Sequence, residues 1–216
     1  MTLSKARSWL RLLRDNRAVA MVEFALAAPV FIVLVMAGLE VANLALAHMR
    51  VSHIAMTVAD NAGREESGID ESDIYEVFAG AESIGVDIDF KANGRVVLSS
   101  LEDNGKNGGN KGQTIAWQRC WGDLAVAPAY GEEGDGADDD ELEDGLGPAG
   151  NKITAMSGTA LMFVEATYDY QPLVGPGWIG TPRIRYESAF NVRDRTNNAI
   201  TNTQSLTQMT CDDDDD

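Results

Sequence analysis

The residues of this chain that could do chemistry are few and far apart. Its 216 residues include two cysteines, Cys120 and Cys211, and two histidines, His48 and His53. Neither histidine has a cysteine close to it in sequence, so the ligand spacing of a zinc site is absent. The two cysteines can form one disulfide that ties the C-terminal tail to the rest of the chain, or they can remain free thiols. An oxidising compartment favours the disulfide.

The sequence holds no motif of a catalytic centre. No serine lies in a G-x-S-x-G pattern, and the glycine-rich run 105–112 lacks the G-K-[ST] ending of a phosphate-binding loop. Many carboxylates are present, but nothing singles out one pair for acid–base chemistry. We therefore expect no enzyme activity, no cofactor and no metal ion.

Acidic residues dominate the charge of the chain. There are 34 acids against 17 bases, a formal net charge of −17. Such a surface repels phosphate backbones, which excludes nucleic acid as a partner. The densest acidic run, 132–144, does not place its carboxylates as an EF-hand does, so we expect a solvated, flexible loop. The five aspartates 212–216 predict a disordered end.

One carboxylate, that of Glu23, stands in an unusual setting. The basic segment 1–18 leads directly into an apolar stretch that ends near Ala47, and Glu23 lies just after the start of that stretch. Its uncharged part, Phe24–Leu39, is somewhat shorter than the roughly 20 residues that cross a bilayer, and a second acid, Glu40, follows directly after it. We expect both acids near the membrane interfaces. The positive-inside rule keeps residues 1–18 in the cytoplasm and places the chain after His48 on the other side.

The apolar segment has three possible fates. It can remain uncut as a signal anchor. It can be a secretory signal peptide cut after Ala45-Leu46-Ala47, which would release a soluble binding protein. It can also follow a short leader that is cut on the cytoplasmic side, so that the helix is kept. The mass of the mature chain distinguishes the three.

The string RAVAMVEFALAAPVFIVLVMAGLEVANLAL, residues 17–46, resembles the N-terminus of TadE-like pseudopilins of tight-adherence (Flp-type) pilus systems. The resemblance lies in the Val-Glu-Phe-Ala core, in Pro29 and in the Gly-Leu-Glu exit. It implies that a prepilin peptidase cuts between Ala18 and Val19, so that Glu23 becomes the fifth residue. The family usually has glycine where this chain has Ala18. Glu23 and Phe24 would then act in assembly.

Simple electrostatics explains why a glutamate belongs at that position. After the cut, Val19 would carry a free α-amine with a pKa near 8, mostly protonated at neutral pH. A carboxylate four residues on, from the same helix or from a neighbouring subunit, can neutralise that amine among apolar helices. The helix N-terminus also favours a nearby negative charge. Glu23 would therefore act as a charge partner and would set the register between helices.

The elements that position these residues form an α+β protein: a long N-terminal transmembrane helix, the pilin-like stem, packed on a small antiparallel β-sheet head. Helical spacing of apolar residues predicts one helix from Val19 to about Arg64, about 70 Å long. It comprises the transmembrane part 19–47 and its continuation 48–66. The head, 67–193, should hold a short capped helix, 71–79, and an antiparallel meander, followed by the tail 194–216. We expect strands at 86–90, 95–100, 114–119, 160–170 and 183–192, with a hairpin turn at Asn93-Gly94.

The resemblance implies a minor pilin-like subunit that acts in assembly of a Flp/Tad-type adhesion pilus. The segments WQRCWG, YDYQPL and RIRYESAFNVR in the head also resemble the C-terminal regions of that family. By this resemblance, the chain would be a single-pass protein of the bacterial inner membrane, with a cytoplasmic N-terminus and a periplasmic head. Its partners would be other pilin-like subunits, the pilus secretion machinery, prepilin peptidase and the lipid bilayer. The alternative is a secreted or membrane-anchored periplasmic binding protein with no pilus role.

Overall fold

The computed structural model describes residues 16–211, except 66–67, 176, 178–179, 194 and 196. Most of the expected leader and the five terminal aspartates lie outside the described residues. The chain divides into two compact units, Met1–Asn43 and Leu44–Asp216, and each is described by itself.

One helix, α2 (Asn16–Arg64), begins in the first unit and ends in the second. This confirms the expected long helix and its end at Arg64. Its Val19–Arg64 part is long and apolar enough to cross a membrane. Among the described residues it holds an 18-residue window of mean hydropathy 2.5, none of which is buried. Pro29 lies inside the helix, as membrane helices tolerate. Near the C-terminal end, Arg64 pairs with Asp60 one turn earlier.

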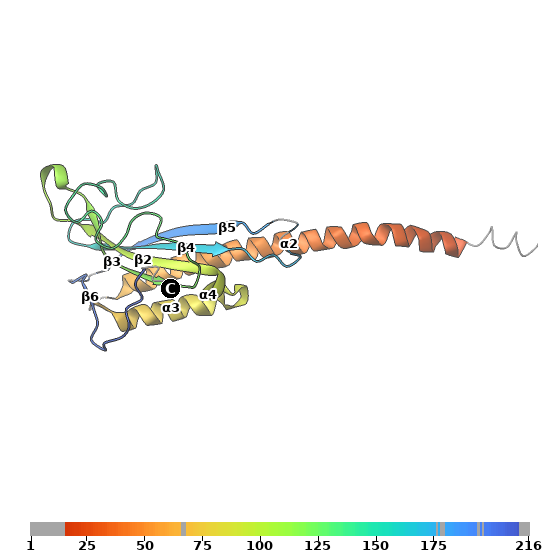
Figure 1. Ribbon diagram of the computed structural model, residues 1–216, viewed down its shortest axis with the longest axis horizontal. Helices are drawn as coiled ribbons and strands as arrows, with labels where there is room; N and C mark the ends of the chain where they lie inside the picture. The colour runs from red at the N-terminus through yellow and green to blue at the C-terminus, as the bar shows by residue number, and fades with distance from the viewer. Residues whose placement is uncertain are drawn as a thin grey trace, which may run out of the picture. The chain divides into compact units, whose positions relative to one another are not determined.

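The head is built on a four-stranded antiparallel sheet (Figure 1). Its strands are β2 (Gly94–Asp103), β3 (Gln113–Trp121), β4 (Ala160–Asp169) and β5 (Arg183–Asn191), in the order β3-β2-β4-β5. The expected meander is therefore wrong in one connection, because β4 pairs with β2 and not with β3. The segment 122–159 between β3 and β4 is long enough to return across the sheet. A second, two-stranded sheet pairs β1 (Ile69–Asp70) with β6 (Ile200–Thr201) in parallel.

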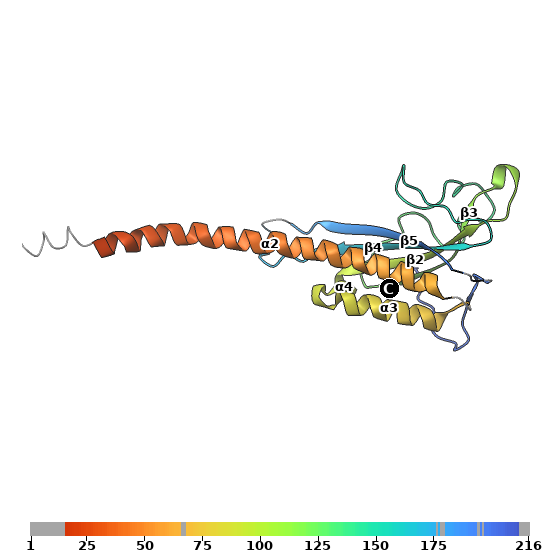
Figure 2. The ribbon, with the colours of Figure 1, turned by 180° about the vertical axis from the view of Figure 1, so that it is seen from behind.

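The sheet separates two apolar clusters. On one face, α2 and α3 (Glu71–Gly85) cover the sheet, as Figures 1 and 2 show. The larger cluster lies there and joins Ile54 and Val58 of α2 to Leu98 and Val164 of the sheet. On the other face, the long segment between β3 and β4 supplies Leu142, Leu146 and Ala155 to a smaller cluster around Phe163.

Sequence patterns misplaced several boundaries near α3. The helix runs to Gly85 rather than to residue 79, and Asp70 caps its N-terminus by accepting the Ser72 N–H in a capping box. The expected strand 86–90 is instead a 3₁₀ turn, η1 (Val86–Ile88), and a short helix, α4 (Phe90–Asn93).

A single aromatic side chain explains this difference. Phe90 is fully buried and stacks on Trp121 and Tyr168, which draws the chain inward where an exposed alternating strand was expected. Asn93-Gly94 is not a hairpin turn, because Gly94 already begins β2. A Cβ on Gly94 would lie 2.7 Å from the Phe90 ring, so the glycine makes room for that ring.

The acidic run 132–144 is held against the head and is not a wholly solvated loop. The side-chain amide of Asn104 donates hydrogen bonds to the carbonyl oxygens of Gly136 (2.9 Å) and Asp139 (3.1 Å). Within the run, Leu142 is buried in the smaller cluster. Lys106 pairs with Asp138 at 2.7 Å, and that pairing lowers the pKa of the Asp138 carboxyl. The number of acidic residues in the run suggested a solvated loop because it gave no weight to the apolar residue Leu142.

Candidate functional site

The expected processing and assembly residues lie in the first turns of α2. The predicted cut between Ala18 and Val19 falls in the first turn of α2, which begins at Asn16. Val19 and Glu23 are four residues apart, so they share one face of the helix. Val19, Glu23 and Phe24 are all exposed, Phe24 by 71%. After the predicted cut, the α-amine of Val19 and the carboxylate of Glu23 would thus be neighbours on an exposed apolar surface that another helix can contact.

The second acid of the apolar stretch behaves differently from Glu23. Glu40 was expected at a membrane interface, but it is 1% exposed. A buried carboxylate is costly unless it is paired, and Glu40 does have an interaction partner. Only Glu23 therefore remains available to groups outside the chain on this stretch of helix.

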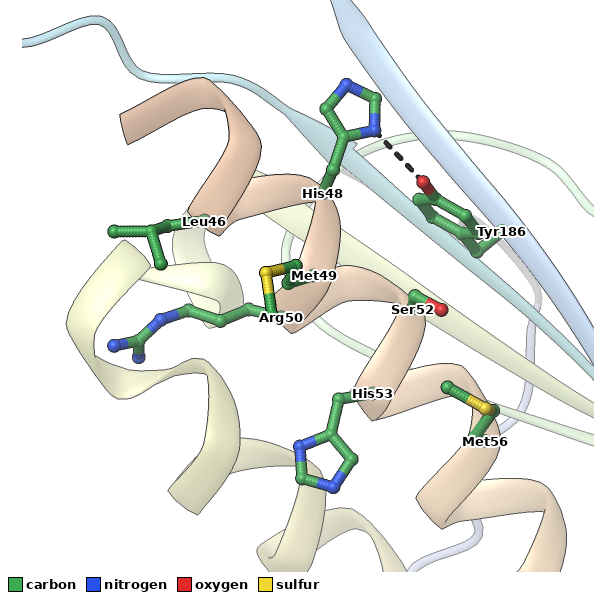
Figure 3. A pocket seen from close by; sticks show the side chains of 8 residues that line it. All are labelled: Leu46, His48, Met49, Arg50, Ser52, His53, Met56 and Tyr186. Atoms are coloured by element: carbon green, nitrogen blue, oxygen red, sulfur yellow. Dashed lines mark hydrogen bonds between the residues drawn. The ribbon is translucent and has the colours of Figure 1, made fainter. Parts of the chain in front are cut away.

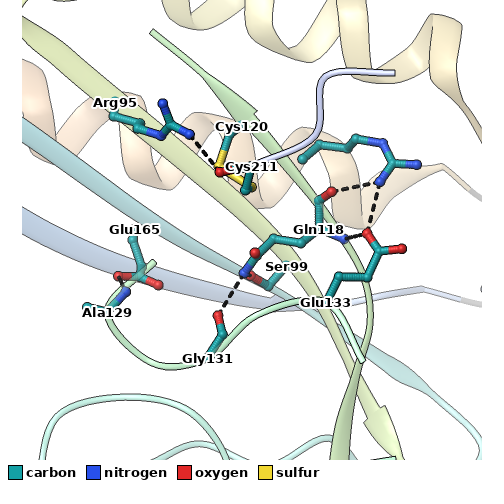
Figure 4. The surroundings of a disulfide bond; sticks show 10 residues. Arg95, Ser99, Gln118, Cys120, Ala129, Gly131, Glu133, Glu165 and Cys211 are labelled. Carbon is teal, nitrogen blue, oxygen red and sulfur yellow. Dashed lines mark hydrogen bonds and ion pairs between the residues drawn. A yellow bond between two sulfur atoms is a disulfide. The ribbon is translucent and has the colours of Figure 1, made fainter. Parts of the chain in front are cut away.

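The disulfide expected between Cys120 and Cys211 is present (Figure 4). It joins β3 to the C-terminal tail across 91 residues of sequence. The tail is also hydrogen-bonded along its path: the Cys120 N–H donates to the Met209 carbonyl at 2.8 Å, and Arg95 donates to the Cys211 carbonyl at 3.0 Å. The covalent bond therefore fixes a segment that already docks on the sheet.

A buried ion pair links the sheet to α3. The Arg119 guanidinium donates to Glu71 at 2.6 Å, and both side chains are almost fully buried. Arg119 also reaches Glu133 of the acidic run at 3.1 Å, and Glu133 accepts the backbone N–H of Gln118 (Figure 4). Paired in this way, the three charges join α3, β3 and the acidic run. Sequence reasoning missed the pair because its members lie far apart in the chain.

Glu165 is a second buried acid that the sequence did not single out. It lies on β4 facing the long β3–β4 segment, where it is 4% exposed and accepts the Ala129 N–H at 3.0 Å (Figure 4). Burial raises the pKa of Glu165 to about 7. Nearby, Tyr130 donates to Glu187 at 2.8 Å, and burial together with that bond raises the pKa of Tyr130 to about 12. Glu165 follows five apolar residues of β4, 160–164, and that contrast was the signal that sequence reasoning could have used.

Both histidines lie on the part of α2 that belongs to the head. A shallow hollow of about 550 Å³ runs along the helix there, beside β5 (Figure 3). The His48 ring nitrogen Nδ1 lies 3.2 Å from the Tyr186 hydroxyl, and the two rings meet edge to face. His53 is exposed on the same helix.

The described part of the chain contains no group of three or more His, Cys, Asp or Glu residues arranged to hold a metal ion. The acidic run instead directs its backbone and carboxylates to Asn104, Lys106 and Arg119, as described above. Of the aromatic residues, Trp117 is buried in the larger cluster and Trp121 packs against it, whereas Trp178 lies outside the described residues.

The fold and the exposed apolar helix define a class: an α+β head carried on an N-terminal helix whose composition indicates membrane anchoring. Residues 18–60 match the model of the family described as TadE-like protein. The match confirms the resemblance over the region that holds Val19, Glu23, Phe24 and Pro29, and it points to a Tad/Flp pilus-associated protein. No curated protein and no solved structure matches the chain. The resemblance of the head segments to the family therefore stays a prediction.

Proposed function

We propose that this protein is a minor pilin-like (pseudopilin) subunit that acts in the assembly of a Tad/Flp-type adhesion pilus. The observation that carries the proposal is the TadE-like segment 18–60, which contains an unburied apolar window of 18 residues and a single exposed acid, Glu23. An uncovered apolar helix of this length needs lipid or other helices around it.

The mechanism is assembly rather than chemical turnover. The basic leader holds the precursor in the inner membrane with its N-terminus in the cytoplasm and its head in the periplasm. Prepilin peptidase removes residues 1–18, and the new amine of Val19 meets the carboxylate of Glu23 on an adjoining subunit. Burial of that charge pair among apolar helices sets the height at which neighbouring subunits pack. The disulfide supports an oxidising location for the head.

The continuity of α2 speaks against the rival fate, a soluble protein released by cutting after Ala47. Ala47 is buried in the head, and Val51 follows one turn later in the same core. A cut there would remove Ala47 and the partly buried Leu44 from the core of the head and leave a new helix end at its edge.

The role of Glu23 can be tested in the bacterium that makes the protein. Glu23→Ala should leave membrane insertion and the level of the protein unchanged but abolish pili seen by electron microscopy, because the α-amine would lose its partner. Glu76→Ala, which removes an exposed acid from α3, is the matched control and should assemble normally. Normal pili in the Glu23→Ala strain would contradict the proposal.

A further inference from the structure

The part of α2 inside the head has two apolar faces, and the head covers only one. Ala47, Val51, Ile54 and Val58 face the head and are buried. On the opposite side, Leu46 is 53% exposed, Met49 68% and Met56 48%, and His53 is exposed between them. Figure 3 shows these side chains along the helix. We call Leu46, Met49, His53 and Met56 the stem seam.

The spacing of the stem seam is that of a helix–helix contact. Its members follow one another at three, four and three residues, as the a and d positions of a heptad do. Scattered apolar residues on a surface need no explanation, but three large ones in one line along three turns form a continuous stripe.

Lipid cannot cover the whole stripe. The transmembrane part is expected to end near Ala47, and Met56 lies nine residues farther along the helix, or about 14 Å at 1.5 Å per residue. The headgroup layer of a bilayer adds only about 5–8 Å on each side. The far end of the stem seam therefore needs protein as its cover.

The distribution of charge on the chain indicates which protein covers the stem seam. The chain is strongly acidic, with a net charge of −17, so most pairs of surfaces on two copies repel each other. From Leu44 to Thr57, however, α2 carries no carboxylate. Its one permanent cation, Arg50, pairs with Asp87 at 2.7 Å. The residues that line the hollow around the stem seam include no carboxylate, and the Asp87 carboxylate beside it is paired with Arg50, so two copies meet less charge repulsion on this face than an acidic surface would impose.

We propose that the stem seam is the contact between two copies of this chain, packed as parallel helices. Two copies anchored in one bilayer by the same helix point the same way and stand at the same height. Each seam residue then meets its own counterpart across a two-fold axis, which is the self-complementary arrangement of a symmetric dimer. His53 sits at an a position, where one polar residue fixes register and strand number at some cost in stability.

The pairing uses the membrane anchoring of the proposed function but neither the leader cut nor Glu23. It is therefore tested on the full chain, with its native disulfide, in phosphatidylcholine vesicles at a low ratio of protein to lipid. Met49→Cys and Met56→Cys place a thiol in the stem seam. Glu82→Cys is the control, because Glu82 is exposed on α3 near Ile84, whose carbonyl accepts a hydrogen bond from Arg50 at a similar height.

Oxidation should give severalfold more covalent dimer, at twice the mass of the chain, with either seam variant than with Glu82→Cys. Met49→Glu added to Met56→Cys should remove that excess while the circular dichroism of the head stays unchanged. His53→Leu added to Met56→Cys should increase it. Equal dimer yields in seam and control variants, or an excess that survives Met49→Glu, would overturn the pairing. Glu23→Ala added to a seam variant should leave the dimer yield unchanged, because the pairing does not use Glu23.

Discussion

At the scale of single residues, three carboxylates show how the surroundings decide what a group can do. Glu23 lies on an exposed apolar helix and is free to meet a charge from another chain. Glu71 is buried but paired with Arg119, so its charge is compensated inside the head. Glu165 is buried and accepts a backbone N–H, and the effect of burial outweighs the attraction of Arg185, so its neutral form is favoured.

The Glu165 carboxyl predicts a pH dependence of stability. Its pKa in the folded chain is about 7, against an ordinary value of 4.5, so the folded state binds the proton more tightly than the unfolded state. Its contribution to stability is therefore fully present below pH 4.5 and is lost as the pH rises through 7. At 1.36 kcal/mol per pKa unit, the loss amounts to roughly 3 kcal/mol.

Glu165→Gln keeps the shape of the neutral acid but cannot ionise. The difference in the free energy of unfolding between this variant and the parent, measured by denaturant titration of the full chain in detergent, should grow in favour of the variant between pH 4.5 and 7. Glu82→Gln, at an exposed acid, should show no such trend. A difference that stays flat across this range would contradict the assignment.

At the scale of elements, the sequence predicted the long helix and four of the strands well. Apolar residues at helical spacing continue from Val19 to Arg64 without a break, and β4 is a nearly continuous apolar run. The errors arose where long-range packing decides. Phe90 turned an expected strand into helical turns by stacking in the core, and the β2–β4 pairing depends on a connection whose path no local pattern reveals.

The candidate site was predictable where it depends on local sequence and was missed where it depends on contacts between residues far apart in the chain. Glu23 and its neighbours stand out because their sequence context is local. The Glu71–Arg119 pair and the setting of Glu165 depend on residues distant in the chain. An oxidising compartment favoured a disulfide between the two cysteines, but the spacing alone also allowed free thiols, and only the fold places the tail beside β3.

The disulfide should stabilise the head mainly by limiting the unfolded chain. For the 91 residues that it spans, loop entropy predicts about 4–5 kcal/mol. The double variant Cys120→Ser with Cys211→Ser should keep the folded tail in place, since backbone and Tyr75 hydrogen bonds also hold it. It should unfold at a clearly lower denaturant concentration than the oxidised parent and should not respond to reductant. A parent whose unfolding is equally indifferent to reductant would contradict this role.

At the scale of the whole molecule, each unit has its own task. The first unit offers an uncovered apolar helix with one acid near its start, which suits a membrane and a bundle of similar helices. The second unit has its own core, a disulfide and a helix face that carries no carboxylate. In the proposed pairing, the acidic surface would keep heads apart except along that face, so charge and apolar contact together would limit how copies associate.

The most direct test of this account is the mass of the mature protein, together with its N-terminal sequence, on material extracted from the membranes of the native bacterium. The account predicts a membrane-bound chain that begins at Val19 and has lost residues 1–18. A soluble chain that begins at His48, or a membrane-bound chain that still carries residues 1–18, would contradict it.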